Sequence, residues 1–193
     1  MHRTLYLIGV GYLAICGMVY VRFREPRAGH RAAPDEPANT VPTTGSGEAW
    51  YAAIKPYCNA VEVEIAQRDH PAPAALEGQG FSAACYALGG KIDSARAVID
   101  RLPSDDRYKA AGIVFAVAHP VADAGDNRSA GPIMELVVAY WPNHYMALYH
   151  AGMAEYGLGQ NELARQHLES FLQYYHQQDG WTRSARETLA RLQ

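Results

Sequence analysis

The feature of this sequence that most constrains its fold is an internal repeat with a period of about 34 residues. Gly90, Gly125 and Gly159 follow one another at intervals of 35 and 34 residues. Small residues recur at the same two intervals on both sides of these glycines: Ala83, Ala118 and Gly152 before them, and Ala95, Ala130 and Ala164 after them. A fixed period of this length is typical of stacked helical hairpins, so three copies of one supersecondary unit are expected.

Each column of the repeat fits two antiparallel helices joined by a short turn. Glycine can take the left-handed conformation that ends one helix and begins a tight turn. Small residues on both sides of that turn let the two helices approach closely. Large apolar residues then follow at helical spacing, namely Ile99 and Leu102, Met134 and Val137, and Leu168 and Phe171. The pattern therefore predicts an all-α chain with no sheet.

The period and its columns resemble the tetratricopeptide repeat over residues 76–175, and Pro142 falls at the proline that ends a unit in that family. The units depart from the family because Gln79, Val114 and Leu148 replace the large aromatic residue near the start of each first helix. The resemblance implies a TPR-like α-solenoid of antiparallel helical hairpins. The alternative is an irregular helical bundle.

Two prolines interrupt the predicted units. Pro103 ends the first unit early, and Pro120 lies inside the first helix of the second unit. Proline removes a backbone donor and clashes with the preceding turn, so the helix should kink or end at Pro120.

A helix is expected on each side of the repeat. Residues 48–68 should form one helix, distorted early by Pro56, with Ile54, Cys58, Val61 and Ile65 on one face. Residues 181–192 place Trp181, Ala185, Leu189 and Leu192 on one face and Arg183, Arg186, Glu187 and Arg191 on the other. A terminal helix with one polar face caps an open-ended stack.

The N-terminal segment is predicted to be a membrane anchor. Leu5 to Val21 form an unbroken apolar run of about 26 Å as a helix, the short end of a bilayer span. We therefore expect a signal-anchor at 1–24 whose residues 5–21 contact membrane lipid, a disordered Pro/Ala-rich tether at 25–47 and a helical domain at 48–193. The rival interpretation of the apolar run is a cleaved signal peptide.

The topology depends on two opposing signals. The arginines that follow the apolar run favour a cytoplasmic body, because positive charge accumulates on the cytoplasmic side. The tether composition and the matched heights of Cys58 and Cys85 across a helical hairpin favour an oxidising compartment. We expect a single-pass protein whose body is periplasmic or otherwise extracytoplasmic. The two cysteines form a disulfide in one interpretation and remain buried thiols in the other.

The sequence shows no pattern typical of catalysis, of a cofactor or of a metal site. Its histidines lack the H-E-x-x-H and H-x-x-x-H spacings that place two imidazoles on one helix face. The body after residue 36 is mildly acidic and has no electrostatic footprint for nucleic acid. We expect a non-enzymatic protein with no cofactor, no metal and no nucleic-acid partner.

The expected function is protein binding, by analogy with the fold. In the resembled family the first helices of successive units line a concave groove, which here places Phe115, His119, Tyr149, Met153 and Tyr156 toward a partner. Aromatic and Met side chains suit an apolar or amphipathic segment of a membrane-associated protein. Two alternatives remain: another segment of the chain covers these residues, or the protein is a structural accessory subunit of a membrane complex held mainly through its transmembrane helix.

Overall fold

The computed structural model of the chain describes residues 46–192, which belong to one compact unit. In this range the backbone forms nine α-helices, one short 3-10 helix and no strand, which confirms the all-α prediction. The helices are α2 (Gly47–Ile54), η1 (Lys55–Tyr57), α3 (Val63–Asp69), α4 (Leu76–Leu88), α5 (Ile92–Asp100), α6 (Ser104–Asp123), α7 (Asn127–Tyr140), α8 (Tyr145–Gly157), α9 (Asn161–Tyr174) and α10 (Gly180–Arg191).

The predicted anchor at 1–24 and nearly all of the predicted tether at 25–47 lie outside the described residues. From Ser46 to Leu192, none of the helices combines the length and the apolar character that a membrane crossing requires.

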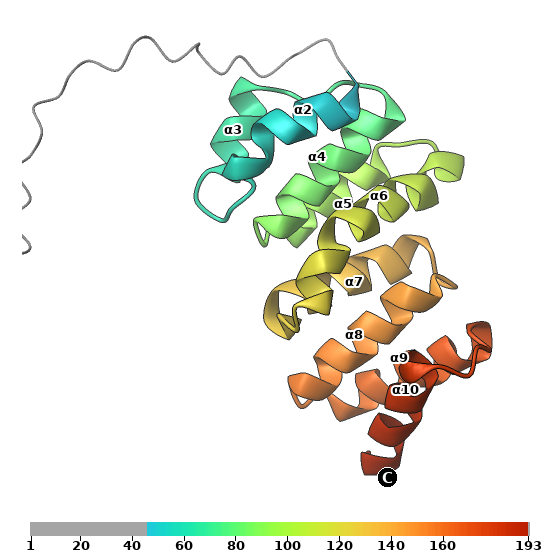
Figure 1. Cartoon of the computed structure of the whole chain (residues 1–193). Helices are drawn as coiled ribbons and strands as arrows, with labels where there is room; N and C mark the ends of the chain where they lie inside the picture. Colours follow the sequence, from blue (N-terminus) through green and yellow to red (C-terminus); the bar gives the residue numbers. More distant parts are fainter. Residues whose placement is uncertain (1–45, 193) are drawn as a thin grey trace, which may run out of the picture. The chain divides into compact units, whose positions relative to one another are not determined.

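The three predicted units are the hairpins α4–α5, α6–α7 and α8–α9, which follow one another along the stack (Figure 1). Gly90, Gly125 and Gly159 lie in the three hairpin turns with φ angles of 71°, 77° and 77°. In the described part of the chain these are the three residues with positive φ. The structure thus confirms the turn function that the repeat predicted for them.

The small-residue columns lie where the two helices of each unit cross. All six of these alanines and glycines are buried. A Cβ atom added to Gly152 would lie 2.7 Å from Leu168 Cγ, which shows how closely α8 and α9 approach. The apolar columns form the core, with Ile99, Met134, Val137, Leu168 and Phe171 fully buried.

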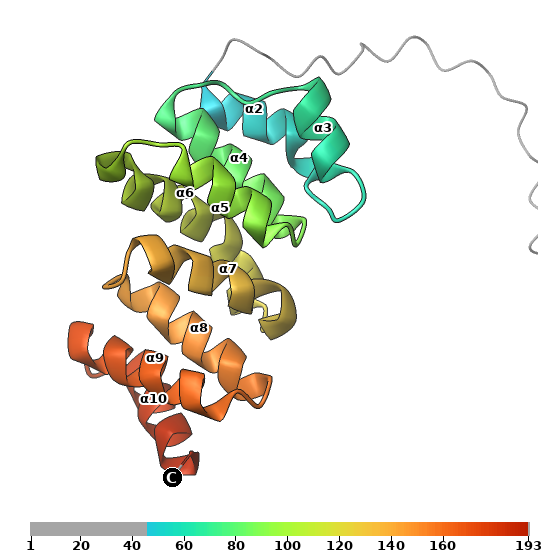
Figure 2. The same ribbon diagram turned by 180° about the vertical axis from the view of Figure 1, so that it is seen from behind.

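The stack is irregular at the junction of the second and third units. The first helices α4 and α6 pack closely, whereas α8 packs on α9 and α7 and meets α6 at few points (Figure 2). Helix α6 also continues through Pro120 to Asp123, so of the two outcomes predicted at this proline, a kink or an end, the end does not occur. Pro120 lies in the last turn, where its carbonyl accepts a hydrogen bond from Ala124 N–H at 3.1 Å.

The single helix predicted at 48–68 is instead α2, η1, a turn and α3, and this prediction is wrong. Pro56 lies in η1, and the side-chain oxygen of Asn59 accepts hydrogen bonds from the N–H groups of Val61 and Glu62, both at 3.1 Å. Such local side-chain bonds compete with helix formation. As a result Val61 and Ile65 point outward, 83% and 53% exposed, instead of joining an apolar face.

The N-terminal helices have their own small core. Trp50, Ile54 and Val63 are fully buried there, next to Cys85 of α4. A disulfide joins Cys58, in the turn after η1, to Cys85, with Cα atoms 4.8 Å apart. The bond ties the irregular segment between α2 and α3 to the first repeat unit.

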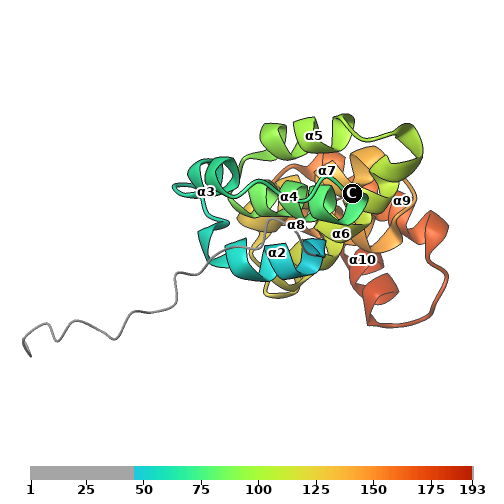
Figure 3. The ribbon, with the colours of Figure 1, turned by 90° about the horizontal axis from the view of Figure 1, so that it is seen from above.

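Helix α10 folds back onto α8 and α9 at the C-terminal end of the stack. Its buried face consists of Thr182, Ala185 and Thr188, while Trp181 stays 37% exposed at the start of the helix. Seen from above, α2 and α5 lie on opposite sides of α4, and α10 lies on the same side as α2 (Figure 3).

Candidate binding face and histidine cluster

The predicted groove residues lie on α6 and α8. Phe115 and His119 are half-buried on α6, where their rings stack with centroids 4.7 Å apart. Met153 and Tyr156 are half-buried on α8, and Thr188 of α10 donates a hydrogen bond to the sulfur of Met153 at 3.7 Å. These four side chains are partly open to solvent.

Tyr149 differs from the other four because α10 covers it. It is only 7% exposed, and its ring contacts Phe171 and Trp181 with centroid distances of 5.2 Å and 4.9 Å. Its hydroxyl donates to Ser184 Oγ at 3.1 Å. The expectation that Tyr149 lines an open groove is therefore corrected, because the final helix packs over this end of α8.

A row of aromatic and imidazole rings connects α6 with α8 and α10. Phe115 lies 4.2 Å from His144, and His119 lies 4.9 Å from His150, both measured between ring centroids. His144 also caps α8, because its Nδ1 accepts a hydrogen bond from Ala147 N–H at 3.2 Å. The members of this ring row are Trp141, His144, Phe115, His119, His150 and Trp181.

A histidine cluster lies within the ring row, where α6 faces α8. Nε2 of His119 and Nε2 of His150 lie 3.4 Å and 3.5 Å from Oδ1 of Asp123, and the ligand atoms of the three residues lie within 4.8 Å of one another. Neither contact has hydrogen-bond geometry, and both Nε2 atoms are buried without a hydrogen-bond partner. We call His119, Asp123 and His150 the histidine cluster.

Burial controls the protonation of two histidines in this region. Removal from water lowers the pKa of His150 to about 4, with a further decrease from nearby His119 and an opposing increase from Asp123. Burial is also the main cause that lowers the pKa of His144. His150 is therefore a neutral imidazole near neutral pH.

A recess of about 310 Å³ opens beside the histidine cluster, between the α6–α7 turn, α8 and α10. Asp123 and His150 form part of its wall, and Trp181 and Met153 supply apolar surface. The complete lining is Ala122, Asp123, Gly125, Asn127, Ala130, Tyr149, His150, Met153 and Trp181.

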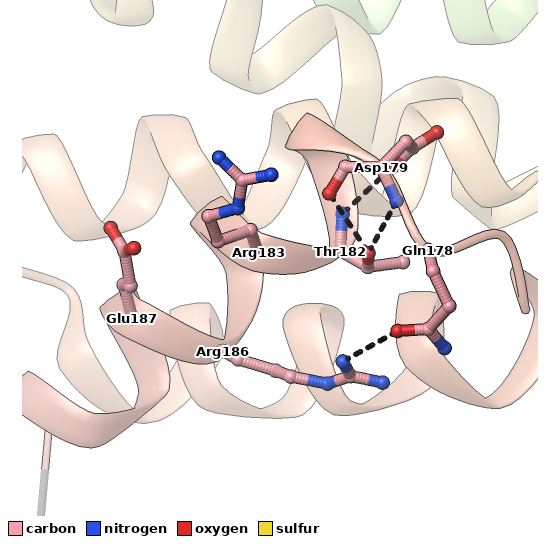
Figure 4. Close-up of a pocket in the computed structure, with 6 residues that line it drawn as sticks. All are labelled: Gln178, Asp179, Thr182, Arg183, Arg186 and Glu187. Carbon is pink, nitrogen blue, oxygen red and sulfur yellow. Dashed lines mark hydrogen bonds between the residues drawn. The ribbon is translucent and has the colours of Figure 1, made fainter.

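A second recess, of about 350 Å³, is polar and lies along the start of α10 (Figure 4). Arg183 and Arg186 border it, but the carboxylate of Asp179 already accepts hydrogen bonds from the N–H groups of Trp181 and Thr182, at 3.0 Å and 3.2 Å. The amides at the N-terminus of α10 are thus occupied, so this recess lacks the free donors that an anion would need.

Sequence reasoning missed Asp123 and His150. The i, i+4 spacing of His119 and Asp123 was visible in the sequence and places both side chains on one face of a helix. His150 comes from the next repeat unit, so its approach depends on how α8 packs.

A comparison with protein families matches part of the chain. The family described as tetratricopeptide repeat matches residues 146–176, which span most of α8 and all of α9. No curated protein and no solved structure matches the chain. The match and the helical hairpins together support a TPR-like helical repeat protein, and a repeat of this family indicates a role in protein–protein interaction.

Proposed function

We propose that this chain is a protein-binding module, with a binding rather than a catalytic role, whose recess beside the ring row takes an apolar or amphipathic segment of a partner. The observation that carries the proposal is the recess itself, because a concave surface with aromatic and Met walls lies on the face formed by α8 and α10. Pockets of this composition are typical of sites that accept apolar side chains.

The position of Trp181 supports this role. Contacts with Tyr149 and His150 hold its ring at centroid distances of 4.9 Å and 5.8 Å, yet 37% of the residue remains exposed. A held and partly exposed tryptophan can gain buried area with little loss of side-chain freedom, which suits a residue that anchors a partner. Met153, on the other side of the recess, adapts its shape readily to apolar groups.

We further propose that the N-terminal apolar run places this module on a membrane. Leu5 to Val21 support an anchor, and the disulfide between Cys58 and Cys85 supports an oxidising, extracytoplasmic compartment for the helical body. The partner would then be membrane-associated.

Site-specific photocrosslinking tests the binding face. The full chain, expressed in its source organism, carries a photoreactive phenylalanine analogue at Met153 on α8, which lines the recess, or, as a matched control, at Leu163, which is 44% exposed on α9. We expect one protein adduct from position 153, none from position 163, and loss of the adduct in a Trp181→Ala background. Equal adducts from both positions, or adducts that survive Trp181→Ala, would contradict the proposed face.

A truncation distinguishes the module from an accessory subunit held by its anchor. A chain without residues 1–45 should still bind the purified partner if the helical body carries recognition. Circular dichroism first establishes that the shortened chain is helical. If the helical fragment fails to bind while the full chain binds, the accessory-subunit interpretation replaces the module.

A further inference from the structure

We propose that His119, Asp123 and His150 bind one divalent transition-metal ion, of the class that Zn²⁺ represents, between α6 and α8. This inference goes beyond the proposed function, because it depends on the histidine cluster alone and holds with or without a partner protein.

The distances within the cluster suit such an ion. A tetrahedral zinc centre with bonds of about 2.0–2.1 Å places neighbouring ligand atoms about 3.3–3.4 Å apart. Oδ1 of Asp123 lies 3.4 Å from Nε2 of His119 and 3.5 Å from Nε2 of His150, close to that spacing. All three ligand atoms lie within 4.8 Å of one another, so small side-chain rotations suffice to close them around an ion.

The unpartnered nitrogens are the second, independent observation. Nε2 of His119 and Nε2 of His150 are buried without a hydrogen-bond partner, and His150 as a residue is only 6% exposed. Buried polar atoms nearly always have partners, and each that lacks one requires an explanation. Both nitrogens lie within 3.5 Å of the same carboxylate oxygen without forming a hydrogen bond to it, a grouping that a shared ion would explain.

The donor set selects the class of metal. Two imidazole nitrogens and one carboxylate oxygen suit zinc and its transition-metal neighbours, whereas Mg²⁺ and Ca²⁺ require mostly oxygen ligands. Three protein ligands leave a coordination position open, as in zinc sites that also bind water or a substrate group. Because Asp123 and His150 also line the recess, water or a ligand in the recess can occupy the open coordination position.

The surrounding rings hold the ligands in place. Phe115 stacks on His119 at 4.7 Å, and Trp181 packs against His150 at 5.8 Å, between ring centroids. Ligands whose side chains are fixed by packing lose little freedom when they bind an ion. The ion would also join the second repeat unit to the third, where α6 and α8 meet at few points.

Metal titration of the purified full chain tests the site. After treatment with a chelator, the protein is titrated with ZnCl₂ by calorimetry, and bound zinc is counted by elemental analysis after dialysis. We expect one equivalent of tightly bound zinc, a higher melting temperature in its presence, and no competition from MgCl₂. CoCl₂ should produce the visible absorption of a four-coordinate cobalt centre.

Matched variants test whether the histidine cluster is what binds zinc. Asp123→Asn changes a residue whose side chain is 47% exposed, so the fold should persist, and circular dichroism checks this. We expect it to weaken zinc binding by more than about tenfold and to abolish the cobalt absorption, with His119→Gln acting likewise. His176→Gln, at an exposed position after α9, should bind zinc as the parent does.

Three results would overturn the site. The first is that the parent binds no zinc. The second is that Asp123→Asn binds zinc with the affinity and stoichiometry of the parent. The third is that His167→Gln, at the Glu155–His167 contact between α8 and α9, loses zinc binding while Asp123→Asn retains it.

Discussion

The hydroxyl of Tyr149 lies 3.1 Å from Oγ of Ser184, a hydrogen bond that joins two residues 35 positions apart. Tyr149 belongs to the third repeat unit and Ser184 to the final helix, so this bond fastens α10 over α8. Through this contact a tyrosine that the repeat pattern assigns to an open groove becomes part of the core, only 7% exposed.

Removal of the Tyr149 side chain should therefore cost stability. We expect Tyr149→Ala to lower the free energy of unfolding by about 3 kcal/mol or more, because it leaves a cavity between Phe171 and Trp181. Tyr149→Phe should cost only about 1 kcal/mol, since it removes the hydrogen bond to Ser184 alone. Urea denaturation of the two variants and of Tyr174→Ala, a control that is 45% exposed, measures these differences. Equal stability of Tyr149→Ala and Tyr174→Ala would show that Tyr149 is not a core residue.

Substitution of a turn glycine of the repeat should lower stability because of its backbone conformation alone. Gly159 has a φ of 77° and open space around its Cβ position, so Gly159→Ala adds left-handed strain without a clash. We expect a loss of about 1–2 kcal/mol in the free energy of unfolding. Gly180 also has open space around its Cβ position but no positive φ, so Gly180→Ala should be neutral or slightly stabilising. Thermal and urea unfolding compare the two, and equal effects would contradict the backbone explanation.

The disulfide between Cys58 and Cys85 should stabilise the N-terminal end of the stack. It links residues 27 positions apart, and closing a loop of that length in the unfolded chain contributes about 3.5 kcal/mol. Reductant should lower the urea midpoint of the parent and leave a Cys58→Ser, Cys85→Ser variant unchanged. Alkylation followed by mass spectrometry should leave Cys58 and Cys85 unlabelled before reduction and label both afterwards. Labelling of both in the oxidised protein would exclude the disulfide.

Stability should fall in mild acid because of His150. Its pKa in the folded state is about 4, below the usual 6.5, because burial disfavours the charged ring. As pH falls, His150 therefore takes up a proton in the unfolded chain before it does so in the folded chain. The contribution of the neutral ring to the free energy of unfolding is lost as pH falls from about 6.5 toward about 4. Between about pH 7.5 and about pH 5 the loss should reach about 2 kcal/mol.

Urea denaturation of chelator-treated protein measures this pH dependence. His150→Gln should show a smaller decrease in stability over the same range, whereas His176→Gln should follow the parent. The same pH dependence in the parent and in His150→Gln would assign the acid sensitivity to other groups.

The local architecture of each repeat unit follows from its own residues. Two local features depend on residue type within a short segment of chain. The hairpin turns require glycine because φ is positive at Gly90, Gly125 and Gly159, and the close helix crossings require small side chains. They recur at every unit, so the period predicted the hairpins, their turns and most of the core. The local reading failed at 48–68, where Pro56 and the side chain of Asn59 replaced helix with a turn and exposed Val61 and Ile65.

Whether a side chain of α6 or α8 faces solvent, the core or a neighbouring helix depends instead on how the helices pack. Tyr149 is buried because α10, more than 30 positions later, returns to cover it. His119 and Asp123 share one helix face through their spacing, but His150 joins them only through the packing of α8 on α7. Periodicity specifies the face of a helix on which a residue lies, whereas the partner of that face depends on the sum of many weak contacts across the stack.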